Sequence, residues 1–78
     1  MNSEVRRLID GRTMAYPGPL MSLISAMHEG DVGSAVEVLV ADRESETDIP
    51  AWVHKAHHEL IETIVDDSYT GFVVKRVA

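Results

Sequence analysis

The sequence predicts a two-layer α/β sandwich, in which a four-stranded mixed sheet carries two helices on one face. Segments with the periodicity of strands and helices follow one another in the order strand, helix, strand, helix, strand, strand. The last two strands are separated by only Asp66, Asp67 and Ser68, a loop short enough for an antiparallel hairpin. If the strands that the helices join are parallel, right-handed crossovers place both helices on the same side of the sheet.

The first strand and the first helix are marked by their periodicity and by their boundary residues. Glu4 to Ile9 alternates loosely between polar and apolar residues and is predicted as a strand. From Gly18 to about Glu29 a helix is predicted, because apolar residues recur on one helical face at Leu20, Leu23, Ile24 and Met27. Pro17 and Pro19 suit the first turn of this helix, and Gly30 is expected to end it.

A second strand and a second helix follow. Ala35 to Ala41 is predicted as a half-buried strand, because valines fall on one of its faces at Val36, Val38 and Val40. The polar segment ADRESETD, residues 41–48, is expected to be a loop. Thr47 is expected to cap a helix that holds Asp48 and Pro50 in its first turn. The buried stripe of this helix is predicted to consist of Ile49, Trp52, Val53 and Ala56.

Two more strands, Glu59 to Val65 and Tyr69 to Val77, complete the predicted sheet. The chain has 78 residues, which is enough for one small domain, so we expect one domain over residues 1–78. We also expect a monomer. The sheet face without helices is the weak point of that expectation, because it leaves room for weak self-association through Leu8, Leu39 and Val73.

The composition excludes several classes of function. The chain has no cysteine, so it forms no disulfide, no thiolate metal site and no thiol nucleophile. Its first ten residues lack the apolar run of a signal peptide, and no segment reaches the roughly 18 apolar residues of a membrane span. We therefore expect a soluble, cytoplasmic protein that does not bind membranes.

The charge of the chain argues against nucleic acid as a direct partner. With 13 acidic and 7 basic residues, the net charge is −6, and a negative field repels phosphate backbones. Five basic residues near the two ends of the chain could gather into one local patch. We interpret them instead as solvated strand positions that protect sheet edges, namely Arg6, Arg7, Arg12, Lys75 and Arg76.

Short motifs distributed over nearly the whole chain resemble the TusA (SirA-like) sulfur-carrier family. In that family an Asp-x-Arg-Gly-x-x-Cys-Pro-x-Pro run follows the first strand, and here Asp10, Arg12 and Pro17-x-Pro19 match it. The later matches, in order, are Asp42, Asp48-Ile49-Pro50-Ala51-Trp52, His58, Tyr69, Phe72, Lys75 and Arg76. The resemblance implies the fold predicted above and, as partner, a sulfurtransferase or a sulfur-acceptor protein. We expect no cofactor.

The sequence departs from this pattern at two positions. Thr13 lies where the family has glycine, and Tyr16 lies where it has the cysteine that carries sulfur as a persulfide. A helix N-terminus stabilises a thiolate, whereas a phenol has a pKa of about 10 and cannot form a persulfide. The resemblance therefore implies a partner-binding module that does not transfer sulfur, with Tyr16 flanked by Asp10, Arg12, Thr13, Pro17, Gly18 and Pro19. A possible second region consists of Asp42, Asp48, Trp52 and His58.

Three explanations of Tyr16 stay open at this point. The chain is a natural relative that kept a docking surface and lost the chemistry, a natural relative with another ligand at the helix end, or a sequence changed deliberately. The second departure, Thr13, favours natural divergence. Two other functions compete with the docking module: a small-anion or ligand binder that uses the Gly18 amide, and an enzyme with Tyr16 as acid or nucleophile, for which no base, metal or cofactor motif is visible.

Other clusters have simpler structural explanations. His54 and His58 have metal-ligand spacing, but we expect the helix to end between them and predict no metal site. Two interpretations of Asp10 and Arg12 are equally consistent with the sequence. The two residues flank a functional site, or they form a charge pair that only closes the loop. Acidic residues at every second position over residues 42–48 faintly resemble a calcium-binding loop. The segment lacks the glycine and the closing glutamate that such a loop needs, so we expect no calcium site there. We expect Met27 and Trp52 to lie in the core, and Met14 to be exposed.

Overall fold

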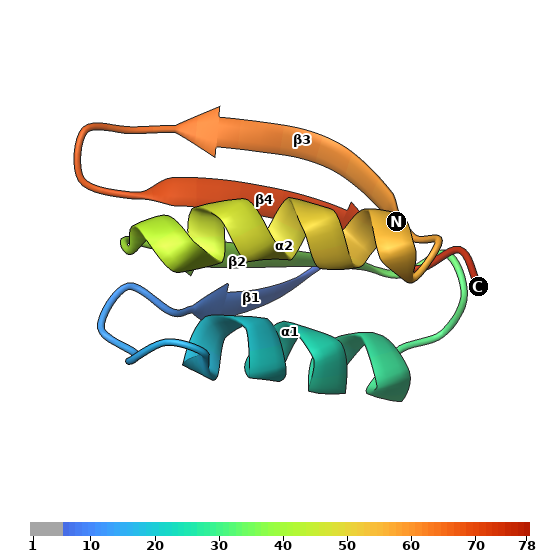
Figure 1. The fold of residues 1–78 in the computed structure, drawn as a ribbon. Coiled ribbons are helices and arrows are strands. Elements are labelled where there is room, and N and C mark those ends of the chain that lie inside the picture. The colour runs from blue at the N-terminus through green and yellow to red at the C-terminus, as the bar shows by residue number, and fades with distance from the viewer. Residues whose placement is uncertain (1–5) are drawn as a thin grey trace.

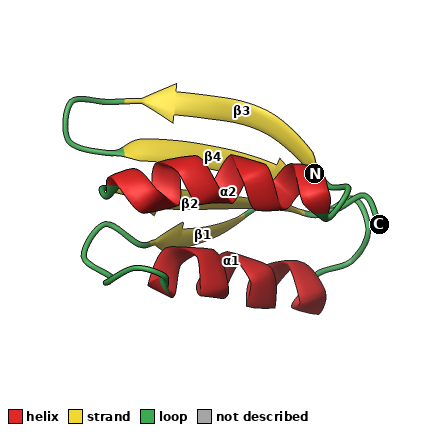
Figure 2. Ribbon diagram, in the orientation of Figure 1, coloured by secondary structure: helices red, strands yellow, loops and turns green. Residues whose placement is uncertain are grey.

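The computed structural model describes residues 6–78, and these residues form the predicted two-layer sandwich (Figures 1 and 2). Both helices cover one face of a four-stranded sheet whose strand order is β1-β2-β4-β3. Strand β1 is parallel to β2, and β4 is antiparallel to both of its neighbours. The elements are β1 (Arg7–Asp10), α1 (Gly18–Glu29), β2 (Ala35–Val40), α2 (Arg43–Lys55), β3 (Glu59–Val65) and β4 (Thr70–Lys75).

The core lies between the helices and the two central strands. The predicted valine face of β2 is buried there, and register places Val36 opposite Val74 and Val38 opposite Phe72 of β4. The helices contribute the fully buried side chains of Leu23 and Ile49. Burial of each such side chain stabilises the fold by roughly 1.5–3 kcal/mol, so this layer supplies most of the driving force for folding.

Helix α1 has the bounds that the sequence predicts. Pro19 lies in its first turn, and the amide of Gly30 donates to the carbonyl of Ala26 at 3.0 Å. The Arg76 guanidinium donates to the carbonyls of Met27 and Gly30, which places a cation at the negative end of the helix. Arg76 therefore lies at the opposite end of α1 from Arg12, so the five basic residues considered from the sequence do not form one patch.

Helix α2 starts earlier than the sequence predicts. The segment over residues 41–48 is not a loop capped by Thr47, because the helix begins at Arg43 with Asp42 as its N-cap. The Asp42 carboxylate accepts the amide hydrogen of Ser45 at 2.9 Å. Glu44 and Glu46 lie in the first turn, where the helix dipole favours negative charge. The run of acidic residues that was interpreted as a loop is thus the acidic start of a helix.

The end of α2 is a Schellman motif centred on His57. The His57 amide donates to the carbonyl of His54 at 3.1 Å, and the His58 amide donates to that of Val53 at 3.0 Å. His57 has a φ of 63°, the left-handed conformation that normally requires glycine. Because the helix ends at Lys55, His54 and His58 do not share a helical face. Within residues 6–78, no group of three His, Asp or Glu side chains is placed to hold a metal ion.

The sheet shows smaller differences from the prediction. Strand β1 extends to Asp10, while Glu4 and Val5 of the predicted strand lie outside the described residues. Strand β4 is shorter at both ends than predicted, and β3 contains a bulge at Ile61. On the face without helices, Val73 is buried and Leu8 is exposed. Neither helix in residues 6–78 is long and apolar enough to cross a bilayer.

Candidate functional site

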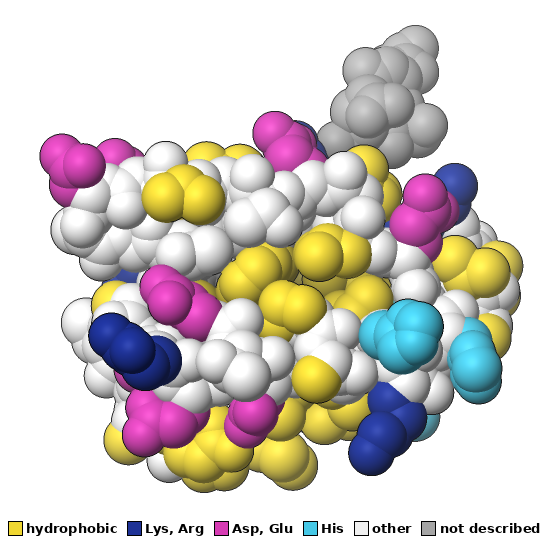
Figure 3. Space-filling model, turned by 45° about the horizontal axis from the view of Figure 1, so that its top comes forward, with side chains coloured by type: hydrophobic (Ala, Val, Ile, Leu, Met, Phe, Trp, Pro, Cys, Tyr) yellow, Lys and Arg dark blue, Asp and Glu magenta, His cyan; other side chains and the backbone are white. Residues whose placement is uncertain are grey.

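Both helices begin at the same end of the sheet. Because β1 and β2 are parallel, the loops that leave them emerge together, and the two helix N-termini lie beside each other at the left in Figure 1. The space-filling view shows several acidic side chains at this end and the visible histidines at the opposite end (Figure 3). This end, which we call the helix-start end, contains the loop of residues 11–17 and the first two turns of α2.

Tyr16 extends from the start of α1 to α2. Its phenol donates a hydrogen bond to the carboxylate of Asp48, while the residue stays 46% exposed. The hydrogen bond to Asp48 raises the pKa of the Tyr16 phenol, and the negative charges of Asp48, Glu44 and Asp42 raise it further. Tyr16 is therefore a neutral hydrogen-bond donor at ordinary pH, which is unfavourable for a nucleophile.

Asp10 and Arg12 form a closed pair within the loop that follows β1. The guanidinium Nε donates to Asp10 Oδ1 and Nη2 donates to Oδ2, both at 2.8 Å. These hydrogen bonds and the amide of Arg12 lower the pKa of the Asp10 carboxyl to about 2. The Arg12 guanidinium also lies 5.5 Å from the centre of the Tyr69 ring. The pair thus fixes the loop, and it still presents an exposed charged surface.

Gly11 is a site residue that the sequence reasoning did not single out. Its amide donates to the carbonyl of Leu39 at 2.8 Å, which ties the loop to β2. A Cβ atom at this position would lie 2.8 Å from the Leu39 carbonyl oxygen and 3.0 Å from the ring of Pro19. Only glycine fits without displacement of the backbone. Its place between two residues of the family motif was a signal that could have identified it.

Met14 covers the start of α1. A Cβ atom at Gly18 would lie 3.2 Å from the Met14 side chain, which shows how closely this side chain packs on the first helical turn. Its sulfur accepts a hydrogen bond from the hydroxyl of Ser22 at 3.8 Å. Met14 is exposed, as expected, and Thr13 before it is exposed as well.

The start of α1 offers few donors to an anion. Pro17 and Pro19 carry no amide hydrogen, and the amide of Gly18 already donates to the carbonyl of Ala15 at 2.7 Å. The carboxylates that raise the Tyr16 pKa add a negative field at this place. Both observations disfavour the small-anion site considered from the sequence.

The four residues grouped as a second region are spread along the whole length of α2. Asp42 caps the start of α2, and Asp48 lies one helical turn before Trp52. Trp52 and His58 lie toward the end of the helix. There the two rings are 5.6 Å apart, and His58 Nδ1 accepts the amide hydrogen of Val77 at 3.2 Å. Burial lowers the pKa of His58, and the charge of Arg76 lowers it further. Trp52 is only half-buried and lines a cavity of about 320 Å³ at this end.

Known proteins resemble this chain over almost its full length. A family model described as Sulfurtransferase TusA matches residues 7–76. A protein of Archaeoglobus fulgidus, provisionally named as a sulfur carrier protein, is 44% identical over 70 residues, which cover 90% of this chain and 96% of that protein. The protein YrkI of Bacillus subtilis, also provisionally named as a sulfur carrier, is 26% identical over 90% of this chain and 93% of its own.

A solved structure resembles the fold. The crystal structure of a SirA-like protein from Desulfitobacterium hafniense has a TM-score of 0.78 to this chain, covering 91% of it and 97% of the crystallised chain. Because the two sequences are only 20% identical, this likeness concerns the fold alone. The observed order of strands and helices and this likeness confirm the predicted fold.

Proposed function

The chain belongs to the TusA family of sulfurtransferases, and we propose that it binds partner proteins of a sulfur relay without carrying sulfur itself. The observation that carries this proposal is the absence of cysteine from all 78 residues, together with Tyr16 directly before Pro17. We place Tyr16 at the position of the persulfide cysteine, because Asp10, Arg12 and the Pro-x-Pro run match the family motif around it.

Chemistry separates this chain from a carrier. A persulfide forms when a thiolate attacks a donor sulfur, so that a new S–S bond forms and the donor's leaving group departs with the electron pair. The Tyr16 oxygen cannot form such a bond, and its proton is held toward Asp48. The feature of a carrier that this chain can still share is the surface that binds partner proteins.

That surface combines exposed apolar side chains with negative charge. Met14, Tyr16 and Met21 are 38%, 46% and 56% exposed at the start of α1. The Asp48 carboxylate accepts the hydrogen bond of the Tyr16 phenol, and the negative charges of Glu44 and Asp42 also act on this phenol. Adaptable methionine and aromatic side chains are common in docking surfaces, and the carboxylates favour a partner with basic residues at its contact. We propose a sulfurtransferase or a sulfur acceptor as that partner.

We further propose that the protein acts in the cytoplasm as a monomer and does not bind nucleic acid. The net charge of −6 supports the last point. The carboxylates around Tyr16 make the helix-start end unsuitable for phosphate.

The test combines binding and transfer with one candidate partner. The chain is mixed with a cysteine desulfurase from the same organism and its substrate cysteine, and complex formation and intact mass are measured. We expect a complex and no change in the mass of the chain. In the Tyr16→Asp variant, an added carboxylate replaces the aromatic contact, and we expect at least tenfold weaker binding, with Ser68→Asp as the control for added charge. A gain of about 32 Da by the chain, one sulfur atom, would contradict the proposal.

A further inference from the structure

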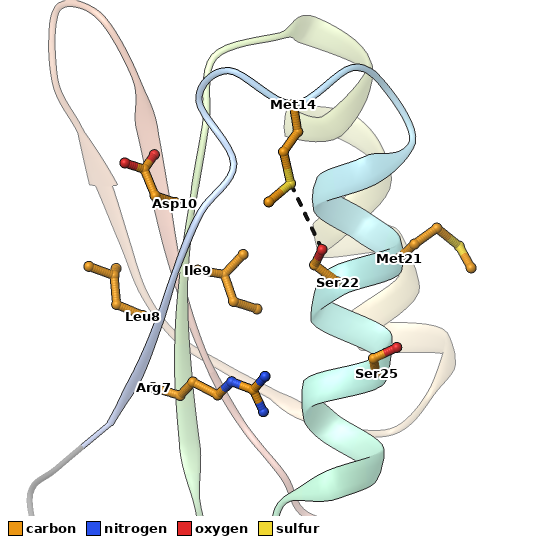
Figure 4. A pocket seen from close by; sticks show the side chains of 8 residues that line it. All are labelled: Arg7, Leu8, Ile9, Asp10, Met14, Met21, Ser22 and Ser25. Atoms are coloured by element: carbon orange, nitrogen blue, oxygen red, sulfur yellow. Dashed lines mark hydrogen bonds between the residues drawn. The ribbon is translucent and has the colours of Figure 1, made fainter.

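A groove separates the outer edge of β1 from α1 (Figure 4). It has a volume of about 510 Å³. In Figure 4, Arg7, Ile9 and Met14 extend toward α1, whereas Leu8 and Asp10 extend to the other side of β1. The wall on the side of α1 includes the small side chains of Ser22 and Ser25.

The backbone of β1 presents hydrogen-bonding groups along this edge. In a parallel pair, the amide and the carbonyl of one residue point to the same neighbour, and the direction alternates along the strand. The Gly11 amide points to β2, where it donates to the Leu39 carbonyl at 2.8 Å. By this alternation, the amide and carbonyl of Ile9 also form hydrogen bonds with β2. The amides and carbonyls of Leu8 and Asp10 point away from β2, outward from the edge of the sheet. These four groups have no backbone partner among residues 6–78.

A strand added at the β1 edge would lie in the plane of the sheet, with helix α1 on one of its faces. Figure 1 shows α1 displaced beyond the β1 edge of the sheet, on the face that carries both helices. A strand added to β1 would gain the backbone bonds of Leu8 and Asp10, and its alternate side chains would face Ile9, Met14 and Ser22. The edge and the helix thus form a site suited to an extended chain.

The two edges of the sheet differ in their protection. The β3 edge carries a bulge at Ile61 and two glutamates, Glu59 and Glu62, which are common protections against edge pairing. Strand β1 has a regular register with β2 and contains no proline or bulge, and its two charged residues, Arg7 and Asp10, are paired with Glu29 and Arg12 of the same chain. The sheet is therefore open to pairing at the β1 edge and protected at the other.

The charged groups of the groove are already paired within the chain. The Arg7 guanidinium lies 2.7 Å from the Glu29 carboxylate, and the Arg12 guanidinium lies 2.8 Å from that of Asp10. A charged side chain in the groove would find no unpaired partner among these groups. The net charge of −6 further disfavours an acidic segment.

We propose that the β1 edge accepts an extended segment of a partner protein as a fifth strand, with apolar or hydroxyl side chains directed toward α1. The segment contains no acidic residue in the part that lies in the groove. A second copy of this chain does not fit the same edge. Two-fold pairing of β1 with β1 would bring the second α1 to the face and edge where the first α1 already lies. The proposal does not depend on sulfur trafficking.

The test uses a phage-displayed library of random twelve-residue peptides, selected on the full chain, followed by synthesis of the selected peptides. Amide NMR spectra and hydrogen exchange then locate their binding. We expect the peptides to alternate apolar and polar residues. We also expect them to shift the signals of Ser22 and Ser25, and to slow the exchange of the Leu8 and Asp10 amides.

Two changes isolate the backbone bonds. Leu8→Pro removes an outward amide and leaves the bonds between β1 and β2 in place, so it should weaken peptide binding about tenfold. The control, Leu8→Ala, keeps that amide and should weaken binding by no more than about threefold. Methylation of alternate amides of the peptide gives an independent measurement on the unchanged protein, and one of the two methylation patterns should abolish binding.

Three results would overturn the proposal. The first is a library that yields no peptide, or peptides whose signals map away from β1 and α1. The second is equal binding of a selected peptide to the original chain and to a folded Leu8→Pro variant, together with tolerance of both methylation patterns. The third is a dimer in sedimentation equilibrium that Leu8→Pro dissociates, since this would assign the edge to a second copy.

Discussion

The phenol of Tyr16 at the start of α1 donates a hydrogen bond to the carboxylate of Asp48 in α2. This contact joins residues that are 32 positions apart, and it connects the two helices at the end where both begin. It also directs the phenol toward a carboxylate, where a carrier of sulfur would need a reactive thiolate. In the proposed function, this contact lies where a carrier would have its thiol.

The Tyr16 phenol should titrate above the ordinary tyrosine value of about 10, because Asp48 and its acidic neighbours disfavour the phenolate. In a Tyr69→Phe background, the ultraviolet absorbance of tyrosinate reports Tyr16 alone. Addition of Asp48→Asn should move the titration back toward pH 10. A Tyr16 titration that Asp48→Asn leaves in place would show that the hydrogen bond does not form in solution.

The same shift affects stability at high pH. Because the folded pKa is raised, the stabilisation from Tyr16 is complete below about pH 10 and declines as the pH rises toward the folded value. The free energy of unfolding of the original chain should therefore approach that of Tyr16→Phe in strong alkali.

The pair of Asp10 and Arg12 predicts a loss of stability in acid. The carboxyl of Asp10 has its pKa lowered from 3.8 to about 2, so its contribution is complete above the unfolded value. It should decline as the pH falls from about 4 through about 2. Urea unfolding at several pH values should show the difference between the original chain and Asp10→Asn shrinking over this interval. Arg12→Gln removes the partner of Asp10 and should make the stability of the fold less dependent on pH over the same interval. A difference between the original chain and Asp10→Asn that stays constant with pH would refute the pairing.

Replacement of His57 by glycine should stabilise the fold. His57 holds the left-handed conformation, with a φ of 63°, at the end of α2. Relief of this conformation should raise the free energy of unfolding by about 1 kcal/mol. The matched control is Ala56→Gly one position earlier, where φ is −84° and glycine should lower stability by about 0.5–1 kcal/mol. Equal effects of the two substitutions in urea unfolding would contradict the Schellman assignment.

The sequence was sufficient for the fold wherever local signals agreed. Helix α1 has periodic apolar residues, prolines at its start and Gly30 at its end, and its bounds were predicted correctly. Helix α2 was predicted to start at Thr47 because residues 42–48 are polar, although Asp42 is a good cap and acidic residues suit a first helical turn. Polar composition was given more weight than capping chemistry.

The candidate site was less accessible to sequence reasoning, since it depends on the contacts between elements. Nothing local in the sequence connects Tyr16 with Asp48, which meet only because β1 and β2 are parallel and both helices leave the same end. The grouping of Asp42 with His58 failed for a related reason. Asp42 caps the start of α2, whereas His58 follows the end of the helix and lies beside Trp52. Periodicity predicts which face of an element is buried and does not predict which ends meet.

The central proposal is that the helix-start end keeps the architecture of a sulfur carrier, with Tyr16 in place of the thiol. The most direct measurement is the intact mass of three proteins after incubation with a cysteine desulfurase and cysteine: the original chain, Tyr16→Cys and Ser68→Cys. Ser68 is exposed in the β3–β4 loop at the same end of the molecule, so it controls for any accessible cysteine. We predict a gain of about 32 Da, one sulfur atom, by Tyr16→Cys alone. A gain by the original chain, or equal gains by Tyr16→Cys and Ser68→Cys, would contradict the claim.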